Sequence, residues 1–259
     1  MTRSNCLLAV DAGNTNVVFG LFQGDDLLKT WRMATLIART SDEYTAFLHG
    51  CMERLGIDSN QIFNIMVASV VPPLDLPLTQ AFKEWIQVHP DFVRPGLKTG
   101  LPIHYDPPQD VGADRIVNAV AAKELYGSPA VVVDFGTATT FDVISSAGAY
   151  EGGMICPGVQ LSVEILHSRA ARLPRVDIRK PENLVGKSTQ ESIRSGIFFG
   201  YLSMVDGILK RLVAQLSSST KIIATGGYAS LIGSESEYIQ HVDPDLTLYG
   251  LKILHERNR

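Results

Sequence analysis

Two short segments of the sequence combine an aspartate, a glycine and a threonine directly after an apolar run. Residues 11–15 are Asp-Ala-Gly-Asn-Thr, and residues 134–137 are Asp-Phe-Gly-Thr. In such a turn glycine lets the backbone approach a ligand, N–H groups and the threonine hydroxyl donate to phosphate oxygens, and the carboxylate holds a hard cation directly or through water. One such turn alone is more typical of a tight hairpin with a capping aspartate. Two copies in matching contexts favour a triphosphate held between them, with Asp11 and Asp134 both facing it.

A third candidate is the segment 112–115, Gly-Ala-Asp-Arg, at the predicted start of a helix. Asp114 suits a general base and Arg115 suits the binding of an anionic substrate. Ordinary capping charges at a helix N-terminus explain the same pair, and the sequence leaves both interpretations open. Upstream, the proline-rich segment 100–108 is expected to be irregular, so Tyr105 either lines a pocket or packs without a further role.

Two familiar nucleotide-binding motifs are excluded. The segment 186–188, Gly-Lys-Ser, resembles the end of a Walker A loop, but the position five before Gly186 is Pro181, and the polar residues 179–183 cannot form the buried strand that such a loop follows. Neither Asp-x-Gly turn continues as Gly-x-Gly-x-x-Gly, which excludes a Rossmann fingerprint. His104 and His167 have no neighbour in the sequence that suggests a metal site or a catalytic triad. We therefore expect each to be either an exposed surface residue or a hydrogen-bonded core residue, without a catalytic role.

The elements that must position these residues fall into two similar series. Residues 6–28 and residues 130–150 each contain an apolar strand, an Asp-x-Gly turn, a second strand, a turn with glycine and a short third strand. Two such series far apart in one chain predict a duplicated fold. We therefore divide the chain into an N-terminal half, 1–129, and a C-terminal half, 130–259, with the active-site cleft between them.

Apolar spacing and turn signals predict the remaining elements. Helices are expected at about residues 41–55, 76–87, 114–126, 157–171, 191–216 and 246–256, with a short one after the glycine pair 226–227. Further strands are expected at 65–71 and 221–225. Meanders of strands followed by helices in each half indicate an α/β fold with two mixed sheets flanked by helices.

The composition limits the partners and the compartment. With 259 residues, 45% hydrophobic and a net charge of −4, the chain has a sizeable core and gives no electrostatic reason to bind nucleic acid. The longest nearly unbroken apolar run, 65–71, is far shorter than the roughly 20 residues of a membrane span. Cys6, Cys51 and Cys156 are expected to be reduced, buried residues of a cytoplasmic protein that acts on small molecules.

Taken in order, these segments resemble the motifs of the type III pantothenate kinases. The matching segments are 11–16, 112–115, 134–139 and 152–158, extended by 169–174, 186–189, 195–196 and 225–227. The resemblance covers the chain from Leu8 to about Asn258. Its departures are small: Ala12 stands where family members often carry valine, and Ala113 where either alanine or valine is usual. It implies the duplicated, actin-like and ribonuclease-H-like fold shared with acetate and sugar kinases.

The resemblance also implies an activity and a set of site residues. The activity is ATP-dependent phosphorylation of pantothenate to 4'-phosphopantothenate, the first step of coenzyme A biosynthesis. The ATP phosphates are expected on Asp11, Ala12, Gly13, Asn14, Thr15, Asn16, Val17, Val18 and Thr137. Pantothenate is expected on Tyr105, Gly112, Ala113, Asp114, Arg115 and Thr189.

Further expectations concern protons and cations. Asp114 is expected to accept the proton of the primary hydroxyl of pantothenate, and Arg115 to pair either with the pantothenate carboxylate or with the transferring phosphate. Asp134 is expected to bind a monovalent cation, K+ or NH4+, which the family requires. Mg2+ is expected with ATP, positioned through Asp11 and water.

The family forms homodimers in which the partner subunit completes the pantothenate pocket, so a homodimer is expected here too. Phe198, Phe199 and Tyr201 place apolar side chains on more than one side of the helix 191–216. Contact with a second chain suits this pattern, and full burial within one chain explains it nearly as well.

Two alternative functions stay open at this point. A kinase of the same superfold acting on a sugar or acetate would share the Asp-x-Gly turns, but has no reason to keep the segment 112–115 together with Tyr105 and Thr189. A nucleotide-binding regulatory protein of the same fold would bind ATP without releasing ADP in the presence of pantothenate.

Overall fold

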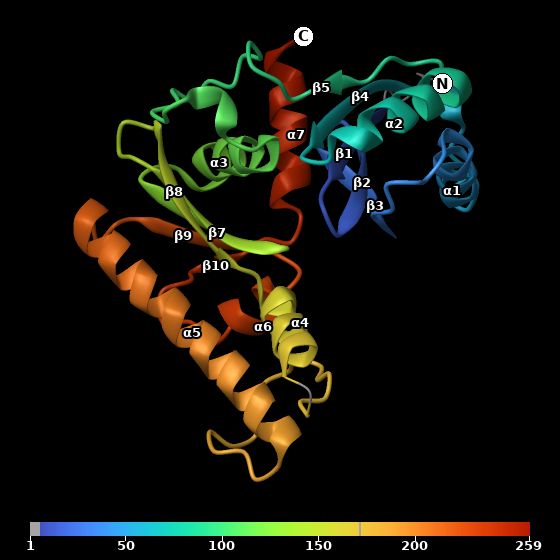
Figure 1. The fold of residues 1–259 in the computed structure, drawn as a ribbon. Helices are drawn as coiled ribbons and strands as arrows, with labels where there is room; N and C mark the ends of the chain where they lie inside the picture. Colours follow the sequence, from blue (N-terminus) through green and yellow to red (C-terminus); the bar gives the residue numbers. More distant parts are fainter. Residues whose placement is uncertain (1–5, 171) are drawn as a thin grey trace. The chain divides into compact units, whose positions relative to one another are not determined.

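The computed structural model describes residues 6–170 and 172–259, which divide into two units. The first unit contains the described residues up to Gly100 together with 106–121 and 247–259. The second unit contains residues 101–105 and 122–246. Each unit has its own five-stranded sheet (Figure 1).

The sheet of the first unit has the strand order β3-β2-β1-β4-β5. The strands are β1 (Cys6–Ala12), β2 (Asn16–Gln23), β3 (Asp26–Ala34), β4 (Ile62–Ser69) and β5 (Asp91–Phe92). The first three form an antiparallel meander, whereas β4 is parallel to β1 and β5 is parallel to β4. The sheet is therefore mixed, as the sequence predicts.

Helices cover both faces of this sheet. Side chains alternate between the faces of a strand, so each face presents apolar residues to be covered. Leu8 and Val10 of β1 and Phe19 of β2 belong to the core that α1 (Ser41–Glu53) and α2 (Asp75–Ala81) close on one face. On the other face, Gly20 contacts Leu248 of the C-terminal helix α7 (Leu246–Arg257), so closely that an added Cβ would lie 2.8 Å from a leucine methyl.

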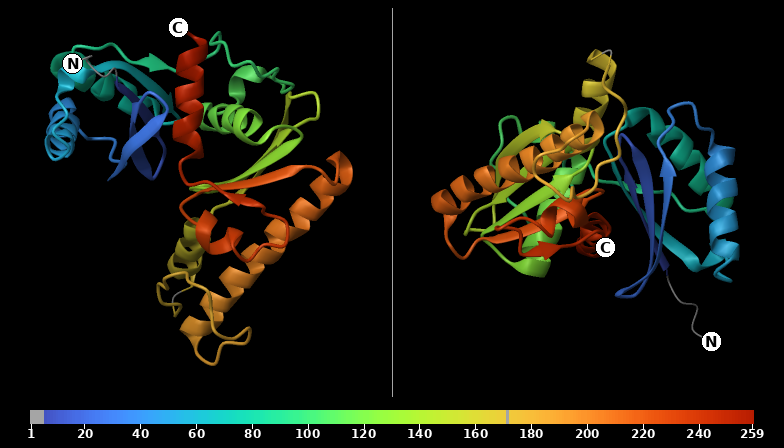
Figure 2. Two further views of the ribbon diagram at one scale, coloured as in Figure 1. Left: turned by 180° about the vertical axis from the view of Figure 1, so that it is seen from behind. Right: turned by 90° about the horizontal axis from the view of Figure 1, so that it is seen from below.

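The sheet of the second unit has the order β10-β9-β6-β7-β8. The strands are β6 (Ala130–Phe135), β7 (Ala138–Ile144), β8 (Tyr150–Pro157), β9 (Lys221–Gly226) and β10 (His241–Val242). Helices α4 (Val159–Arg169), α5 (Thr189–Leu216) and α6 (Ala229–Gly233) contribute to the core on one face of this sheet. Figure 2 shows the long helix α5 crossing that face.

The two sheets share one topology. In each, three strands form an antiparallel meander, a fourth strand runs parallel to the first, and a short fifth strand runs parallel to the fourth. An Asp-x-Gly turn joins the first two strands in both cases. This correspondence confirms the predicted duplicated α/β fold with two mixed sheets.

The elements predicted from the sequence are confirmed with small shifts at their ends. The predicted helix 76–87 is α-helical only as far as Ala81; Phe82–Ile86 form a π-helical turn, and Gln87 at φ 63° ends it. The helix α3 (Ala113–Tyr126) begins one residue before its predicted start. Ala171, the predicted end of the helix 157–171, lies outside the described residues.

The cysteine prediction is wrong in part. All three cysteines are free thiols, and Cys6 is buried, but Cys51 and Cys156 are only half-buried. Cys156 lies in the last part of β8, where residues alternate between half-buried and exposed. Its burial is therefore set by its place in the strand and not by its apolar character alone. Across the described parts of the chain, no helix has both the length and the apolar character needed to cross a membrane.

Candidate functional site

The first Asp-x-Gly turn lies between β1 and β2. Asp11 is in the last part of β1, and the Gly13 N–H donates to the Asn16 carbonyl over 3.0 Å to close the turn. The side chains of Asn14, Thr15 and Asn16 are exposed, so they are accessible to a ligand. Ala12 and Val17 are fully buried. Ala12 and Val17 can therefore contact a nucleotide through their backbone atoms but not through their side chains.

Thr35, directly after β3, fastens this turn and was not singled out by the sequence. Its hydroxyl donates to the Gly13 carbonyl over 2.6 Å, and its backbone N–H donates to the Thr15 carbonyl over 2.9 Å. The pairing of Asn16 with Ala34 places Thr35 beside the turn. Only the register of β2 and β3 could have revealed this contact, because Thr35 lies about 20 residues downstream of the turn.

Asp114 lies in the first turn of α3, where its Oδ1 accepts a hydrogen bond from the Arg115 N–H over 2.8 Å. The carboxyl is half-buried, and an added Cβ on Gly112 would lie 2.5 Å from the same oxygen. Burial raises the pKa of Asp114, while the hydrogen bond from Arg115 and its positive charge act in the opposite direction. A carboxyl with a raised pKa beside a buried arginine is suited to general-base work.

The second Asp-x-Gly turn follows β6 and is enclosed by backbone. Asp134 pairs with Thr140 of β7 and with Thr225 of β9. Gly226, at φ +91°, lies so close that an added Cβ would be 2.5 Å from Asp134 Oδ1. Only glycine fits this combination of backbone conformation and close approach.

Gly158 closes the opposite side of the second turn. Its N–H donates to the Thr137 carbonyl over 3.1 Å, and an added Cβ would overlap that carbonyl oxygen. The same residue is the N-cap of α4. The glycines at 158 and 226 were part of the motif set in the sequence, but their packing against Thr137 and Asp134 is a property of the fold.

Tyr105 and Thr189, the two predicted pantothenate-binding residues of the second unit, lie on different elements. Tyr105 is half-buried at the end of the segment 101–105, which pairs with the start of β8. Thr189 is the exposed first residue of α5 and lines an open hollow of about 880 Å3 with Leu166 and Ile193. The structure records no contact between Tyr105 and Thr189 within the described chain.

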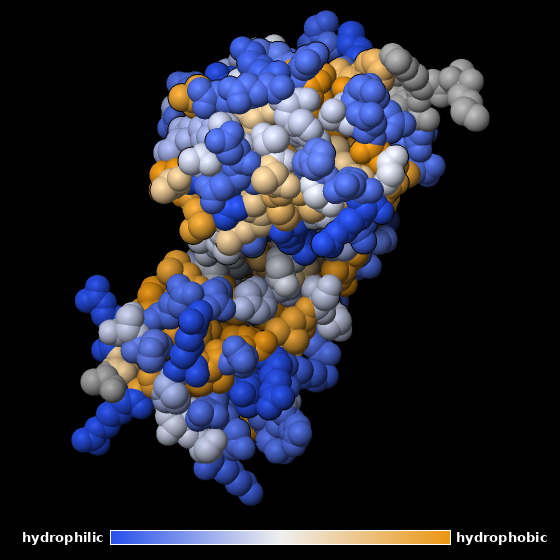
Figure 3. Space-filling view, turned by 90° about the vertical axis from the view of Figure 1, so that its right-hand side faces the viewer, coloured by the Kyte–Doolittle hydropathy of each residue, from blue (hydrophilic) through white to orange (hydrophobic). Residues whose placement is uncertain are grey.

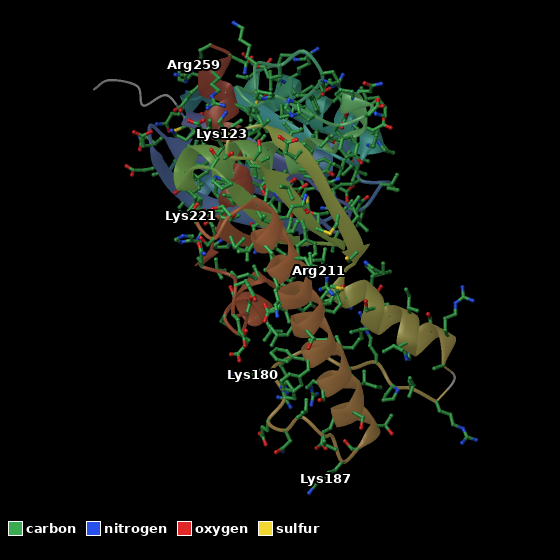
Figure 4. The ribbon with its side chains drawn as sticks, turned by 90° about the vertical axis from the view of Figure 1, so that its left-hand side faces the viewer. Lys123, Lys180, Lys187, Arg211, Lys221 and Arg259 are labelled. Atoms are coloured by element: carbon green, nitrogen blue, oxygen red, sulfur yellow. The ribbon has the colours of Figure 1, made fainter. Side chains whose placement is uncertain are left out.

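The start of α5 confirms that the segment 186–188 is no Walker A loop. No strand occurs among the described residues 172–188 that precede α5. Figure 4 shows Lys187 at the end of α5, with its side chain directed away from the protein. A lysine in this position cannot hold the phosphates of a nucleotide above a strand–loop–helix unit.

The histidines and metal-binding groups give no rival site. His104 is exposed and pairs with the Glu151 carboxylate over 3.2 Å, and His167 is exposed and contacts the Leu173 carbonyl, which confirms their surface positions. Over residues 6–170 and 172–259, no three His, Cys, Asp or Glu side chains form a group that could hold a metal ion.

Two mixed sheets of one topology, each with an Asp-x-Gly turn between its first strands, define an actin-like fold of the kind found in ATP-dependent small-molecule kinases. Solved structures support this fold assignment. A Campylobacter jejuni protein named as a Baf family transcriptional activator matches with a TM-score of 0.61 and 22% identity, covering 97% of this chain and 98% of its own. A Sinorhizobium meliloti protein named as a 2-dehydro-3-deoxygalactonokinase matches with a TM-score of 0.55 and 11% identity, covering 96% of this chain and 98% of its own.

Sequence comparison narrows the class to one family. The profile of the type III pantothenate kinases matches residues 7–211. A type III pantothenate kinase of Halalkalibacterium halodurans is 50% identical over 252 residues, which cover 97% of this chain and 99% of the relative. The chain belongs to the type III pantothenate kinase family.

Proposed function

We propose that the protein transfers the γ-phosphoryl group of ATP to the primary hydroxyl of pantothenate, giving 4'-phosphopantothenate and ADP. This reaction is the first step of coenzyme A biosynthesis. Membership of the type III pantothenate kinase family supports the activity. Within the chain, the observation that carries the proposal is Asp114, a half-buried carboxyl with a raised pKa beside the buried Arg115.

The proton is the part of the reaction that this site must handle. As the hydroxyl oxygen of pantothenate bonds to the γ-phosphorus, the bond from that phosphorus to the β,γ-bridging oxygen breaks and ADP leaves. Asp114 accepts the hydroxyl proton. Arg115 supplies a fixed positive charge for an anionic group, either the pantothenate carboxylate or the transferring phosphate. Gly112 and Ala113 contribute their backbone to the same subsite, since Gly112 already lies against the Asp114 carboxylate.

ATP is expected on the two Asp-x-Gly turns. The exposed residues 14–16 offer amide, hydroxyl and N–H groups to phosphate oxygens, and Thr35 keeps their turn closed. Asp11, Ala12, Gly13, Val17 and Val18 contribute through the strand ends and backbone that form this turn. In the second unit, Thr137 offers its hydroxyl from a turn that Gly158 holds through the Thr137 carbonyl.

Kinases of this family use ATP with a divalent metal ion. We propose Mg2+ for this role, because it keeps several waters and binds mainly through phosphates and one or two carboxylates. Asp11 would contribute through a water molecule. Bound Mg2+ neutralises charge on the triphosphate.

A monovalent cation, K+ or NH4+, is proposed at Asp134. The Asp134 carboxylate lies close to the glycines of both neighbouring turns, since its Oδ1 would be 2.5 Å from a Cβ added at Gly226 and 3.6 Å from one added at Gly136. A carboxylate is an oxygen ligand of the kind that hard cations take. Such a cation would offset negative charge near the ATP phosphates.

A homodimer is proposed from the exposed apolar surface of the second unit. Figure 3 shows hydrophobic side chains gathered on the face where α4 lies. The exposed apolar residues of α4, of β8 and of the segment before α5 are Leu161, Ile165, Leu166, Ile155, Leu184 and Val185. Phe198 and Tyr201 of α5 are buried within the chain, so α4 rather than these residues offers the free apolar face. In such a dimer, Thr189 of one copy would reach the pantothenate of the other. We also propose that the enzyme acts in the cytoplasm and has neither nucleic acid nor a membrane as a partner.

The experiment is a coupled assay of ADP release with ATP, Mg2+ and pantothenate, in K+ and then in Na+. We expect pantothenate-dependent ADP release in K+ and much slower release in Na+. A nucleotide-binding regulatory protein would bind ATP and release no ADP in either salt, and a sugar or acetate kinase would respond to those substrates instead. Light scattering coupled to size-exclusion chromatography tests the homodimer, and a monomer at assay concentrations would contradict it.

A further inference from the structure

Tyr105 lies in a segment that has no regular secondary structure of its own. The segment 101–105 is fixed to Tyr150, the first residue of β8, by two hydrogen bonds: the Tyr150 N–H donates to the Pro102 carbonyl and the His104 N–H donates to the Tyr150 carbonyl, each over 2.8 Å. These bonds fix the backbone just before Tyr105. They do not by themselves fix the direction of its ring.

Two residues of β8 contact the Tyr105 ring. The centroid of the Tyr150 ring lies 6.3 Å from that of Tyr105, with the planes tilted by 50°. An added Cβ on Gly152 would lie 3.4 Å from Cδ2 and 3.6 Å from Cε2 of Tyr105. One edge of the ring therefore lies within van der Waals reach of a Cβ at position 152, and the ring pairs with Tyr150.

Gly152 has φ +98°, in the region that favours glycine. Opposite this part of β8, the register of β7 and β8 shifts between Asp142 and Ile144. Such bulges re-aim side chains and are common beside active sites. The irregular geometry of β8 thus coincides with the place where the Tyr105 ring is seated.

Tyr150 is itself anchored in the core. Its hydroxyl donates to Asp142 Oδ1 over 2.8 Å, and the Thr140 hydroxyl donates to Asp142 Oδ2 over 3.0 Å. Asp142 and Tyr150 are both fully buried. A buried carboxylate needs these donors, so the position of the Tyr150 ring is strongly determined.

We propose that Gly152 and Tyr150 are positioning residues for the Tyr105 ring, with Asp142 as the anchor of Tyr150, and that they shape the pantothenate subsite in this way. The inference rests on the proposed function, in which Tyr105 contacts pantothenate. In this proposal Gly152 and Tyr150 are positioning residues and not substrate ligands. Each acts through the ring of Tyr105.

The central variant is Gly152→Ala, and Gly148→Ala is its matched control. Both glycines have positive φ, +98° and +73°, and both lie in the β7–β8 hairpin. An added Cβ at Gly148 meets only the flexible end of the Lys123 side chain, whereas at Gly152 it lies in van der Waals contact with the Tyr105 ring, so a backbone shift that relieves the strain at φ +98° is passed to that ring. Gly152→Ala should raise KM for pantothenate about tenfold, with kcat and KM for ATP within about twofold. Gly148→Ala should leave all three near their wild-type values.

A double-mutant cycle separates positioning from general damage. In a Tyr105→Ala background, Gly152→Ala should no longer raise KM for pantothenate, because the ring that position 152 supports is gone. Additive effects would overturn the inference. If Tyr105→Ala leaves KM for pantothenate unchanged in an active enzyme, the proposed role of Tyr105 fails, and the positioning role in substrate binding fails with it.

Ring position can also be measured without activity. With 3-fluorotyrosine placed at position 105, the 19F resonance should move in Gly152→Ala and in Tyr150→Phe and stay in place in Gly148→Ala. An unmoved resonance in Gly152→Ala would contradict the positioning role even if the protein had no pantothenate kinase activity. A shifted resonance together with absent ADP release would leave the positioning contact intact and reject the proposed function instead.

Discussion

The two Asp-x-Gly turns occupy equivalent places in two sheets of one topology, but different groups hold them. In the first unit, Thr35 binds two carbonyls of the turn, through its hydroxyl and its N–H. In the second unit, the backbones of Gly158 and Gly226 press directly against Thr137 and Asp134. One turn is fastened by hydrogen bonds from a single residue, and the other is enclosed by atoms that leave no room for a side chain.

This difference indicates how each turn can fail. A turn fastened by hydrogen bonds loses its shape when a donor is removed, at a cost of about 1 kcal/mol per bond. A turn against which glycines pack this closely is expected to lose its shape when one carbon is added to them. Substitutions in each turn distinguish these two kinds of failure, and substitution of Asp114 affects a proton acceptor that lies outside both turns.

The largest effect is expected from Asp114→Asn, which removes the proton acceptor and leaves both turns unchanged. We expect kcat to fall by about 10²–10⁴ while the affinity for ATP stays the same. Steady-state kinetics and calorimetric titration with ATP measure the two quantities. Near-normal turnover in this variant would exclude Asp114 as the base, and a parallel loss of ATP affinity would mean that the site and the first turn are not independent.

Gly226→Ala should have the next largest effect, and Gly13→Ala is its counterpart in the other turn. At φ +91° the alanine costs about 1–3 kcal/mol of stability from its backbone conformation alone, and its Cβ displaces the Asp134 carboxylate. At Gly13 an added Cβ lies 3.2 Å from the Asn16 carbonyl oxygen, which a small shift relieves. Denaturant unfolding should show a larger loss for Gly226→Ala, and the K+ dependence of ADP release should weaken only in that variant. Equal losses would remove the distinction between the turns.

Thr35→Val tests the first turn by removing one donor while keeping the shape of the side chain. Loss of the hydrogen bond to the Gly13 carbonyl should cost about 1 kcal/mol, seen as a rise of about fivefold in KM for ATP. The matched control is Thr35→Ser, which keeps the hydroxyl and should remain close to the wild type. If Thr35→Ser raises KM for ATP and Thr35→Val does not, the methyl group rather than the hydrogen bond matters.

The smallest effect is expected on the acid limb of the pH profile. Burial raises the pKa of Asp114 above the usual aspartate value of about 3.9. As the pH drops through this raised pKa, Asp114 becomes protonated, so kcat/KM for pantothenate should fall. The stability contribution has the opposite direction: it is present below the pKa of the unfolded chain and is lost as the pH rises through the higher pKa of the folded protein. Kinetics and unfolding measured between pH 4 and 7 should show both trends, and Asp114→Asn should remove the stability trend.

Local patterns predicted much of this protein and long-range contacts escaped prediction. The strands around each Asp-x-Gly turn follow from adjacent residues, so the duplicated topology could be inferred from the sequence. The role of Thr35 depends on the pairing of β2 with β3, and the seat of Tyr105 depends on a segment that pairs with β8 some 45 residues later. Such contacts are fixed by tertiary packing, which no local window of sequence contains.

The helix α7 covers one face of the first sheet, although its residues 247–257 are translated after the entire second unit. Until they leave the ribosome, Gly20 and Phe22 lack their partners Leu248 and Tyr249, and Asp25 lacks the Lys252 ammonium that lies 2.7 Å away. The first sheet to be made is thus among the last to be completed. The apolar face that Gly20 and Phe22 present to α7 is therefore covered only when the last residues of the chain have been made.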